Sequence, residues 1–223
     1  MKFDLKIFKD PGISDRLIAG IIIFHNLECL KYNSTLWAEI RAIENRYRNR
    51  FKSPSEALNM LKPARSLYRA MGIEPTQIRP SSEALFRRII KGKPLYQINS
   101  IVDAGNLASL SFLLPIGLYD WEKINGSILF RRGAEGESYE GIGKERINVS
   151  GRITLSDQSG AFGNPSSDSL RTSISVGTSN VLMVIFAPID YSQIKLQEHL
   201  NFSQEIMLKY HPSGIINYQK ILV

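Results

Sequence analysis

The chain has 223 residues, of which 43% are hydrophobic and 22% are charged, values typical of a folded globular protein and not of a disordered one. Its longest apolar run, residues 17–24, is much shorter than the roughly 20 residues that a membrane-spanning helix needs. A single cysteine excludes an internal disulfide, and the three histidines lack the spacing of a metal site. We therefore expect a cytoplasmic protein with one compact domain, no membrane partner, no metal and no cofactor.

The chain is basic, with 28 Lys and Arg residues against 21 Asp and Glu residues and a formal net charge of +7. A basic excess favours a polyanionic partner such as a nucleic acid, although many basic proteins bind none. The same side chains also suit a solvated surface, and both interpretations stay open. The candidate RNA-binding residues are those that cluster in the sequence: Arg79, Arg87, Arg88, Lys91, Arg131 and Arg132.

The first part of the chain predicts strands followed by helices. Residues 2–8 alternate apolar and polar side chains, as a strand with one buried face does, whereas residues 17–24 are apolar on both faces, as a central strand is. Between residues 34 and 71 apolar side chains recur every three or four positions, which indicates two or three amphipathic helices with an interruption at Pro63. Another helix is expected from residue 81 to residue 90.

An apolar helix over residues 102–114 leads into a glycine-rich second half. There, short runs of β-forming residues predict strands, residues 193–210 return to helical spacing, and residues 156–169 are expected to form a loop that borders a binding site. The predicted strands cover residues 127–131, 147–155, 170–175, 181–186 and 215–223. The expected fold is α+β, with N-terminal strands and helices packed on a glycine-punctuated mixed sheet or partly closed β-barrel.

Four short motifs carry a resemblance to a known family. Residues 102–106 (VDAGN) and 114–120 (LPIGLYD) resemble the V-D-x-x-N helix and the P-L-H-A-F-D turn of the editing module in the phenylalanyl-tRNA synthetase β subunit. Residues 136–140 (GESYE) and 178–182 (TSNVL) are similar to its G-E-T and T-x-N-V-L segments, and the order and separations agree. The chain thus resembles a free-standing homologue of that tRNA-binding and editing double domain.

On this resemblance the whole chain is one editing-like domain with a family core over residues 79–188. Residues 1–78 then form an N-terminal strand and helical extension, and residues 189–223 form a C-terminal helix and strand. One residue departs from the family pattern, because Gly117 stands where the family's turn has His. A histidine contact to the terminal nucleotide or to the attacking water is therefore absent.

The resemblance implies tRNA or aminoacyl-tRNA as the partner, or a free amino acid, and a metal-independent hydrolysis of the aminoacyl ester. Such an ester is already reactive, so the site needs a positioned water and stabilisation of the carbonyl oxygen more than a strong nucleophile. Asp120 and Glu140 are the candidate catalytic residues, since either can orient the water or bind the ammonium of the amino acid. The candidate substrate-binding residues are Asn106, Gly117, Tyr119, Gly141, Gly143 and Thr178.

Several functions remain open at this point. The first is an RNA-binding protein that recognises aminoacyl-tRNA ends and deacylates mischarged tRNA in trans, which the presence of Asn106 and Thr178 favours. The second is a non-catalytic binding module for an amino acid, a nucleotide or an RNA end, which Gly117 favours. The third is a metabolic enzyme acting on a small amino-acid derivative, whose turnover would not respond to tRNA. The oligomeric state is not indicated by the sequence.

Overall fold

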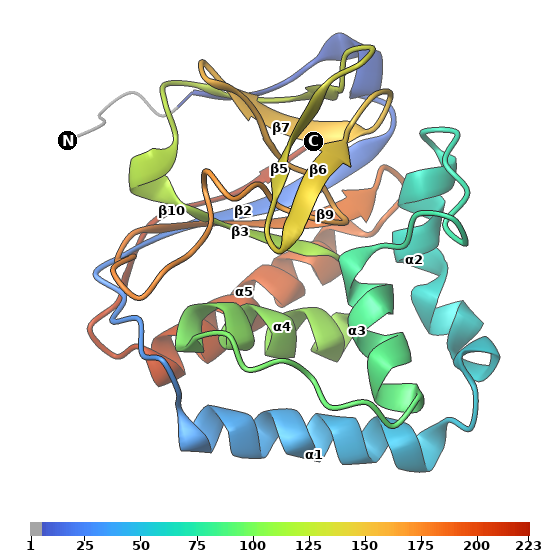
Figure 1. Cartoon of the computed structure of the whole chain (residues 1–223), viewed down its shortest axis with the longest axis vertical. Helices are drawn as coiled ribbons and strands as arrows, with labels where there is room; N and C mark the ends of the chain where they lie inside the picture. Colours follow the sequence, from blue (N-terminus) through green and yellow to red (C-terminus); the bar gives the residue numbers. More distant parts are fainter. Residues whose placement is uncertain (1–5) are drawn as a thin grey trace.

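The computed structural model describes residues 6–223, which form three stacked layers (Figure 1). The central layer is an antiparallel sheet in the order β10-β2-β9-β3. Its strands are β2 (Leu17–His25), β3 (Ile116–Asp120), β9 (Val181–Pro188) and β10 (Ile215–Leu222). Within the described residues, no helix is both long enough and apolar enough to cross a lipid bilayer.

Helices cover one face of the central sheet and a second sheet covers the other (Figure 1). The helices are α1 (Ser34–Arg50), α2 (Leu58–Arg69), α3 (Ser81–Ile90), α4 (Ser100–Phe112) and α5 (Gln193–Tyr210). The second sheet has the order β1-β4-β7-β8, with β1 parallel to β4 and the other pairs antiparallel. Its strands are β1 (Ile7–Lys9), β4 (Ile128–Arg132), β7 (Ile153–Asp157) and β8 (Gly160–Gly163), beside a hairpin of β5 (Ser138–Gly141) and β6 (Lys144–Asn148).

The central sheet is buried on both faces, which explains why its two inner strands are apolar at nearly every position. Along β9, Met183 packs toward the helices, whereas Leu182 and Val184 pack toward the second sheet. Because side chains alternate along a strand, each inner strand contributes to two separate cores. The two sheets stay open and stack face to face, so the structure is the mixed-sheet form of the predicted α+β fold and not a barrel.

The helices predicted from periodicity are confirmed, with one correction at Pro63. The interruption expected there is wrong, because Pro63 lies inside α2. Proline removes one backbone donor, but most of a helix's stability in a protein comes from the packing of its apolar face. Leu61, Ala64 and Leu67 of α2 are completely buried and hold the helix together through this position.

The strand predictions are confirmed for β2, β4, β9 and β10, and β1 matches the end of the strand expected over residues 2–8. The part of that strand before residue 6 lies outside the described residues. The single strand expected over residues 147–155 is wrong, since the chain turns at Gly151, whose φ is +71°, and β6 and β7 pair with different strands. The strand expected over residues 170–175 is also wrong, and the loop expected over residues 156–169 contains β8.

Candidate functional site

The alternation of side chains along β3 separates the predicted substrate-binding residues into two groups. Leu118 packs toward the helices and contacts the backbone side of α4 at Gly105, whereas Tyr119 belongs to the core between the two sheets. Asn106 lies on α4, in the helical layer. The structure therefore places Asn106 on the opposite side of the central sheet from Gly117 and Tyr119.

Tyr119 explains why position 117 is glycine. The Tyr119 side chain is completely buried, and its ring folds back over Gly117 on the same face of β3. A Cβ atom at position 117 would lie 2.6 Å from Tyr119 Cζ, and one at Gly163 of β8 would lie 2.5 Å from the same atom. The phenol thus fills the space that a side chain at position 117 would need, and the two glycines are required by this close approach.

The Tyr119 hydroxyl faces a buried carboxyl group, that of Asp168. Burial raises the pKa of Asp168 to about 7, and the Tyr119 hydroxyl and the Leu118 N–H lower it only partly. Burial and the charge of Asp168 raise the pKa of Tyr119 well above its usual value. The two groups interact, yet among the described residues neither Tyr119 Oη nor Asp168 Oδ1 makes a hydrogen bond of ordinary geometry. This is an electrostatically costly arrangement next to the edge of β3.

Replacing Asp168 by asparagine is expected to stabilise the protein at pH 8 by roughly 2–4 kcal/mol, since one unit of pKa corresponds to about 1.4 kcal/mol. The folded-state pKa of Asp168 is raised, so the stability linked to this carboxyl is complete below its ordinary pKa of 3.8 and is lost as the pH rises through about 7. The advantage of the variant should therefore shrink as the pH falls toward 4. Chemical denaturation across this pH range measures it, with the exposed Asp190→Asn as control. Equal stability of Asp168→Asn and wild type at pH 8 would contradict the expectation.

A groove lies beside the β5–β6 hairpin, lined by residues 137–140, 159–161 and 169–171. Its volume of about 440 Å³ is within the range of small-molecule sites. Glu140 is exposed in this groove. Glu137 also lines it, but its carboxylate accepts hydrogen bonds from Arg131, which lower the pKa of Glu137 despite its partial burial. Arg171 is likewise held, by two hydrogen bonds of 2.9 and 3.0 Å to Asp157.

The two predicted glycines of the acidic loop form the tip of the β5–β6 hairpin. Gly141 pairs with Lys144, and Gly143 has a φ of +64°, which favours glycine. Gly141 also bridges to Ser169 at the border of the groove. Glu140 and Gly141 are therefore together at the groove, and the conformation of Gly143 is explained by the turn.

Asp120 and Thr178 meet where β3 ends and β9 begins. Asp120 is buried, and its Oδ2 accepts a hydrogen bond of 2.8 Å from Thr178 Oγ1. The same oxygen forms an ion pair of 3.3 Å with Lys123 Nζ. The backbone N–H of Asp120 donates to the carbonyl of Thr172, which fixes the segment around Thr172 against the edge of β3. The Asp120 carboxylate is therefore bound by side chains of the protein itself. Together, Asp120 and Thr178 hold in place the loop that contains Ser169, a residue that lines the groove.

The predicted RNA-binding residues of the first cluster belong to the helical layer or to the segment before it. Arg87 pairs with the buried Glu83 at 2.6 Å, and the Arg88 guanidinium lies 3.9 Å from the centre of the Tyr96 ring. Arg79 and Lys91 are exposed. Two of the four basic side chains are thus engaged in contacts within the protein.

The second predicted cluster, Arg131 and Arg132, lies on β4 in the second sheet, on the other side of the central sheet from α3 (Figure 1). Arg131 is held by Glu137, and Arg132 Nε donates to the carbonyl of Gly151 at 3.1 Å. Arg87 and Arg88 of α3 therefore lie in a different layer of the fold from Arg131 and Arg132.

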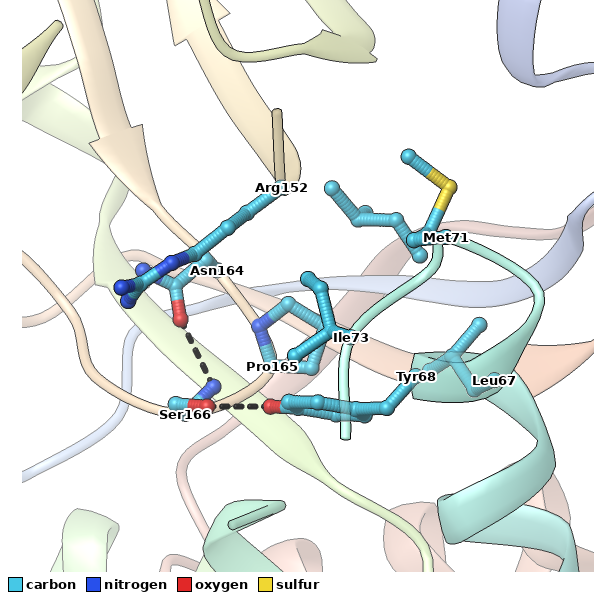
Figure 2. A pocket seen from close by; sticks show the side chains of 9 residues that line it. Leu67, Tyr68, Met71, Ile73, Arg152, Asn164, Pro165 and Ser166 are labelled. Atoms are coloured by element: carbon cyan, nitrogen blue, oxygen red, sulfur yellow. Dashed lines mark hydrogen bonds between the residues drawn. The ribbon is translucent and has the colours of Figure 1, made fainter. Parts of the chain in front are cut away.

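A second hollow, the small pocket, lies between α2 and the segment after β8 (Figure 2). Its lining includes Tyr68 and Met71 near the end of α2, Arg152 before β7, and Asn164 and Ser166 after β8. Asp168, Arg152 and Asn164 were not among the residues expected from the sequence motifs. The signal for Asn164 and Asp168 was the polar composition of residues 156–169, which predicted a binding-site border there without indicating individual residues, and no sequence signal indicated Arg152.

The protein is therefore a three-layer α+β domain in which Glu140 is exposed in a polar groove. Residues 63–208 match the model of the B3/4 domain, well over half of the chain, and the protein belongs to this family. The match begins within α2 and ends near the end of α5, and so extends beyond the motifs at residues 102–182.

Relatives and a solved structure agree with this family. The β subunits of phenylalanine–tRNA ligase from Neisseria meningitidis serogroup B (strain ATCC BAA-335 / MC58) and serogroup A / serotype 4A (strain DSM 15465 / Z2491) are each 25% identical to the chain over 120 residues. That region is 52% of this chain but 15% of each relative. The crystal structure of an N-terminal fragment of the phenylalanyl-tRNA synthetase β subunit from Pyrococcus horikoshii matches with a TM-score of 0.53 at 14% identity, over 99% of this chain and 55% of that one. The resemblance to the synthetase β subunit and the fold it implies are confirmed.

Proposed function

We propose that the protein binds the aminoacylated 3′ end of tRNA in the groove beside the β5–β6 hairpin and hydrolyses the ester bond in trans. Two observations support the proposal. The family match is to a domain found in subunits of a tRNA ligase, and the groove is large enough for an aminoacyl group with part of the terminal nucleoside. The observation that carries it is the exposed Glu140 carboxylate in that groove.

Glu140 is the best placed group to act on a water molecule. Among the described side chains at the groove, the Glu137 carboxylate is bound to Arg131 and the Asp157 carboxylate is bound to Arg171. Asp120 is bound to Thr178 and Lys123, so we assign it a structural role in the proposal. In the reaction, Glu140 accepts a proton from water as the water attacks the ester carbonyl. The bond between the carbonyl carbon and the ribose oxygen then breaks, and the proton passes to that oxygen, giving the free amino acid and tRNA.

The test is deacylation of a panel of correctly and wrongly charged tRNAs by the purified protein and by Glu140→Gln. Glu140→Gln keeps the shape of the side chain but cannot accept the proton, so we expect its rate on the preferred charged tRNA to fall by about 100-fold or more. Glu135→Gln is the matched control, because Glu135 is exposed in the turn before β5 and lines neither hollow. Unchanged deacylation by Glu140→Gln would remove this residue from the mechanism.

A second candidate function is a binding module for the same RNA end without hydrolysis. The observation that favours it is the position of the Tyr119 ring, which fills the space above Gly117 where the family has a histidine side chain. The same panel separates the two functions. Tight binding that weakens as salt is added, with every ester left intact, would favour the binding module.

A further inference from the structure

The small pocket has one polar and one apolar side. In Figure 2 the side chains of Arg152, Asn164 and Ser166 gather on one side, facing Met71 and Ile73 on the other. The pocket volume is about 10 Å³, enough for about one water molecule or one ligand oxygen. Any larger ligand must therefore sit at its mouth and make contact through the polar side.

The neutral polar groups of the pocket are hydrogen-bonded within the protein. Asn164 Nδ2 donates to the Tyr139 hydroxyl at 2.6 Å, and Tyr139 donates to the Ser167 carbonyl at 2.5 Å. Ser166 Oγ donates to the Arg79 carbonyl at 3.0 Å, so the proton between Tyr68 and Ser166 belongs to Tyr68. The hydroxyl donors on this side are therefore consumed within the protein.

The Arg152 guanidinium differs from these groups. It is half-buried and, among the side chains that the structure describes (residues 6–143 and 146–223), it has no carboxylate partner, whereas Arg131 and Arg171 each bind a carboxylate through two N–H groups. Its backbone is fixed, since Arg152 N donates to Val149 and its carbonyl accepts from Gly133. A half-buried guanidinium on a fixed backbone, with no counter-ion among the described side chains, is suited to an anion with two acceptor oxygens, that is, a carboxylate or a phosphate.

A second arginine favours phosphate over carboxylate. The carbonyl of Arg79 is bonded to Ser166 of the pocket, so the backbone of this exposed arginine is attached to the same rim. Two arginines whose backbones lie at the rim of one pocket suit the phosphate of a polyanion. We propose that Arg152 binds a backbone phosphate of an RNA chain at the mouth of the small pocket. The RNA source rests on the proposed function, whereas the phosphate chemistry follows from the pocket alone.

The test is binding, and it does not depend on deacylation. A short single-stranded RNA ending in CCA and, separately, inorganic phosphate are titrated into the wild type, Arg152→Met and Arg16→Met. Arg16→Met removes the same charge from an exposed arginine that pairs with Asp15 and lines neither hollow. We expect Arg152→Met to bind RNA about 10-fold more weakly, with a salt slope lower by about 1, and Arg16→Met to behave as wild type.

Each outcome is decisive. Weaker RNA binding by Arg152→Met alone supports the phosphate contact, and an Arg152→Lys variant that restores part of the affinity strengthens it, since lysine keeps the charge but not the planar guanidinium. If Arg152→Met loses binding of inorganic phosphate but binds RNA as the wild type does, the site binds phosphate and the proposal that the phosphate belongs to an RNA chain is overturned. Wild-type binding of both probes by Arg152→Met, or no binding of either probe by the wild type, overturns the site. If the RNA contact holds while Glu140→Gln deacylates normally, only the assignment of Glu140 fails.

Discussion

Replacing Glu83 by alanine is expected to lower the free energy of unfolding by about 3–5 kcal/mol, because it removes one partner from a buried ion pair. Glu83 of α3 is completely buried and accepts hydrogen bonds of 2.7 and 2.8 Å from Arg65 of α2. Arg87 binds the same carboxylate at 2.6 Å. In the variant Arg65, a residue that is 8% exposed, loses its counter-ion and remains buried.

The pH dependence of Glu83→Ala gives a second check. Burial raises the pKa of Glu83, but the hydrogen bonds and charges of Arg65 and Arg87 outweigh it and hold the pKa below its usual value. A lowered pKa means that the stability is present above the unfolded pKa of about 4.3 and is lost as the pH falls through the folded pKa. The difference in the free energy of unfolding between wild type and Glu83→Ala should therefore become smaller at acidic pH. Urea denaturation measures it, with the exposed helical Glu205→Ala as control, and a loss below 1 kcal/mol at pH 7 would show that the ion pair contributes little.

Introducing the family histidine at position 117 is expected to destabilise the protein by roughly 3 kcal/mol and not to create an editing site, because the new side chain overlaps the Tyr119 ring. A Cβ atom alone would lie 2.6 Å from Cζ of a ring that is completely buried, so neither side chain can move aside without opening the core between the sheets. Gly177→His is the control, since a Cβ atom there meets nothing within 4 Å.

A double-mutant cycle tests the cause of this loss. Tyr119→Ala removes the ring and costs about 3–5 kcal/mol by itself, as a large buried aromatic residue does. The double variant Gly117→His with Tyr119→Ala should then be more stable than the sum of the two losses predicts, since the histidine occupies the vacated space. Additive losses in thermal or chemical denaturation would mean that the overlap with Tyr119 is not what excludes a side chain at position 117.

Most of the fold follows from local patterns in the sequence. Unbroken apolar runs predicted the inner strands β2 and β9, and spacing by three or four residues predicted α5 with its observed bounds, Gln193–Tyr210. The errors fall where the pattern is weak. A single glycine, Gly151, ends one strand and begins another, and β3 was hidden in a segment that resembled a turn. Pairing with β9 determines β3, and no local sequence signal indicates that partner.

The candidate site was less predictable than the fold. The sequence predicted a site that contains Glu140, which lines the groove, and Asn106, which lies across the central sheet from it. A motif shows only that its residues are close in sequence. Because side chains alternate along β3, neighbours such as Leu118 and Tyr119 point into opposite cores. The sequence also does not show which arginines bind a carboxylate of the same protein. Arg131 forms an ion pair with Glu137, whereas Arg152 lines the small pocket.

The sequence by itself determined the α+β class, the family resemblance and the positions of nearly all helices, because these depend on periodicity and on short motifs. Only the tertiary structure decided that Tyr119 fills the space above Gly117, that Asp120 is bound to Thr178, and that Arg152 lines the small pocket. The physical reason is the range of the interactions. Helix and strand patterns arise from residues a few positions apart, whereas burial, close packing and charge pairing join side chains that are far apart in the chain.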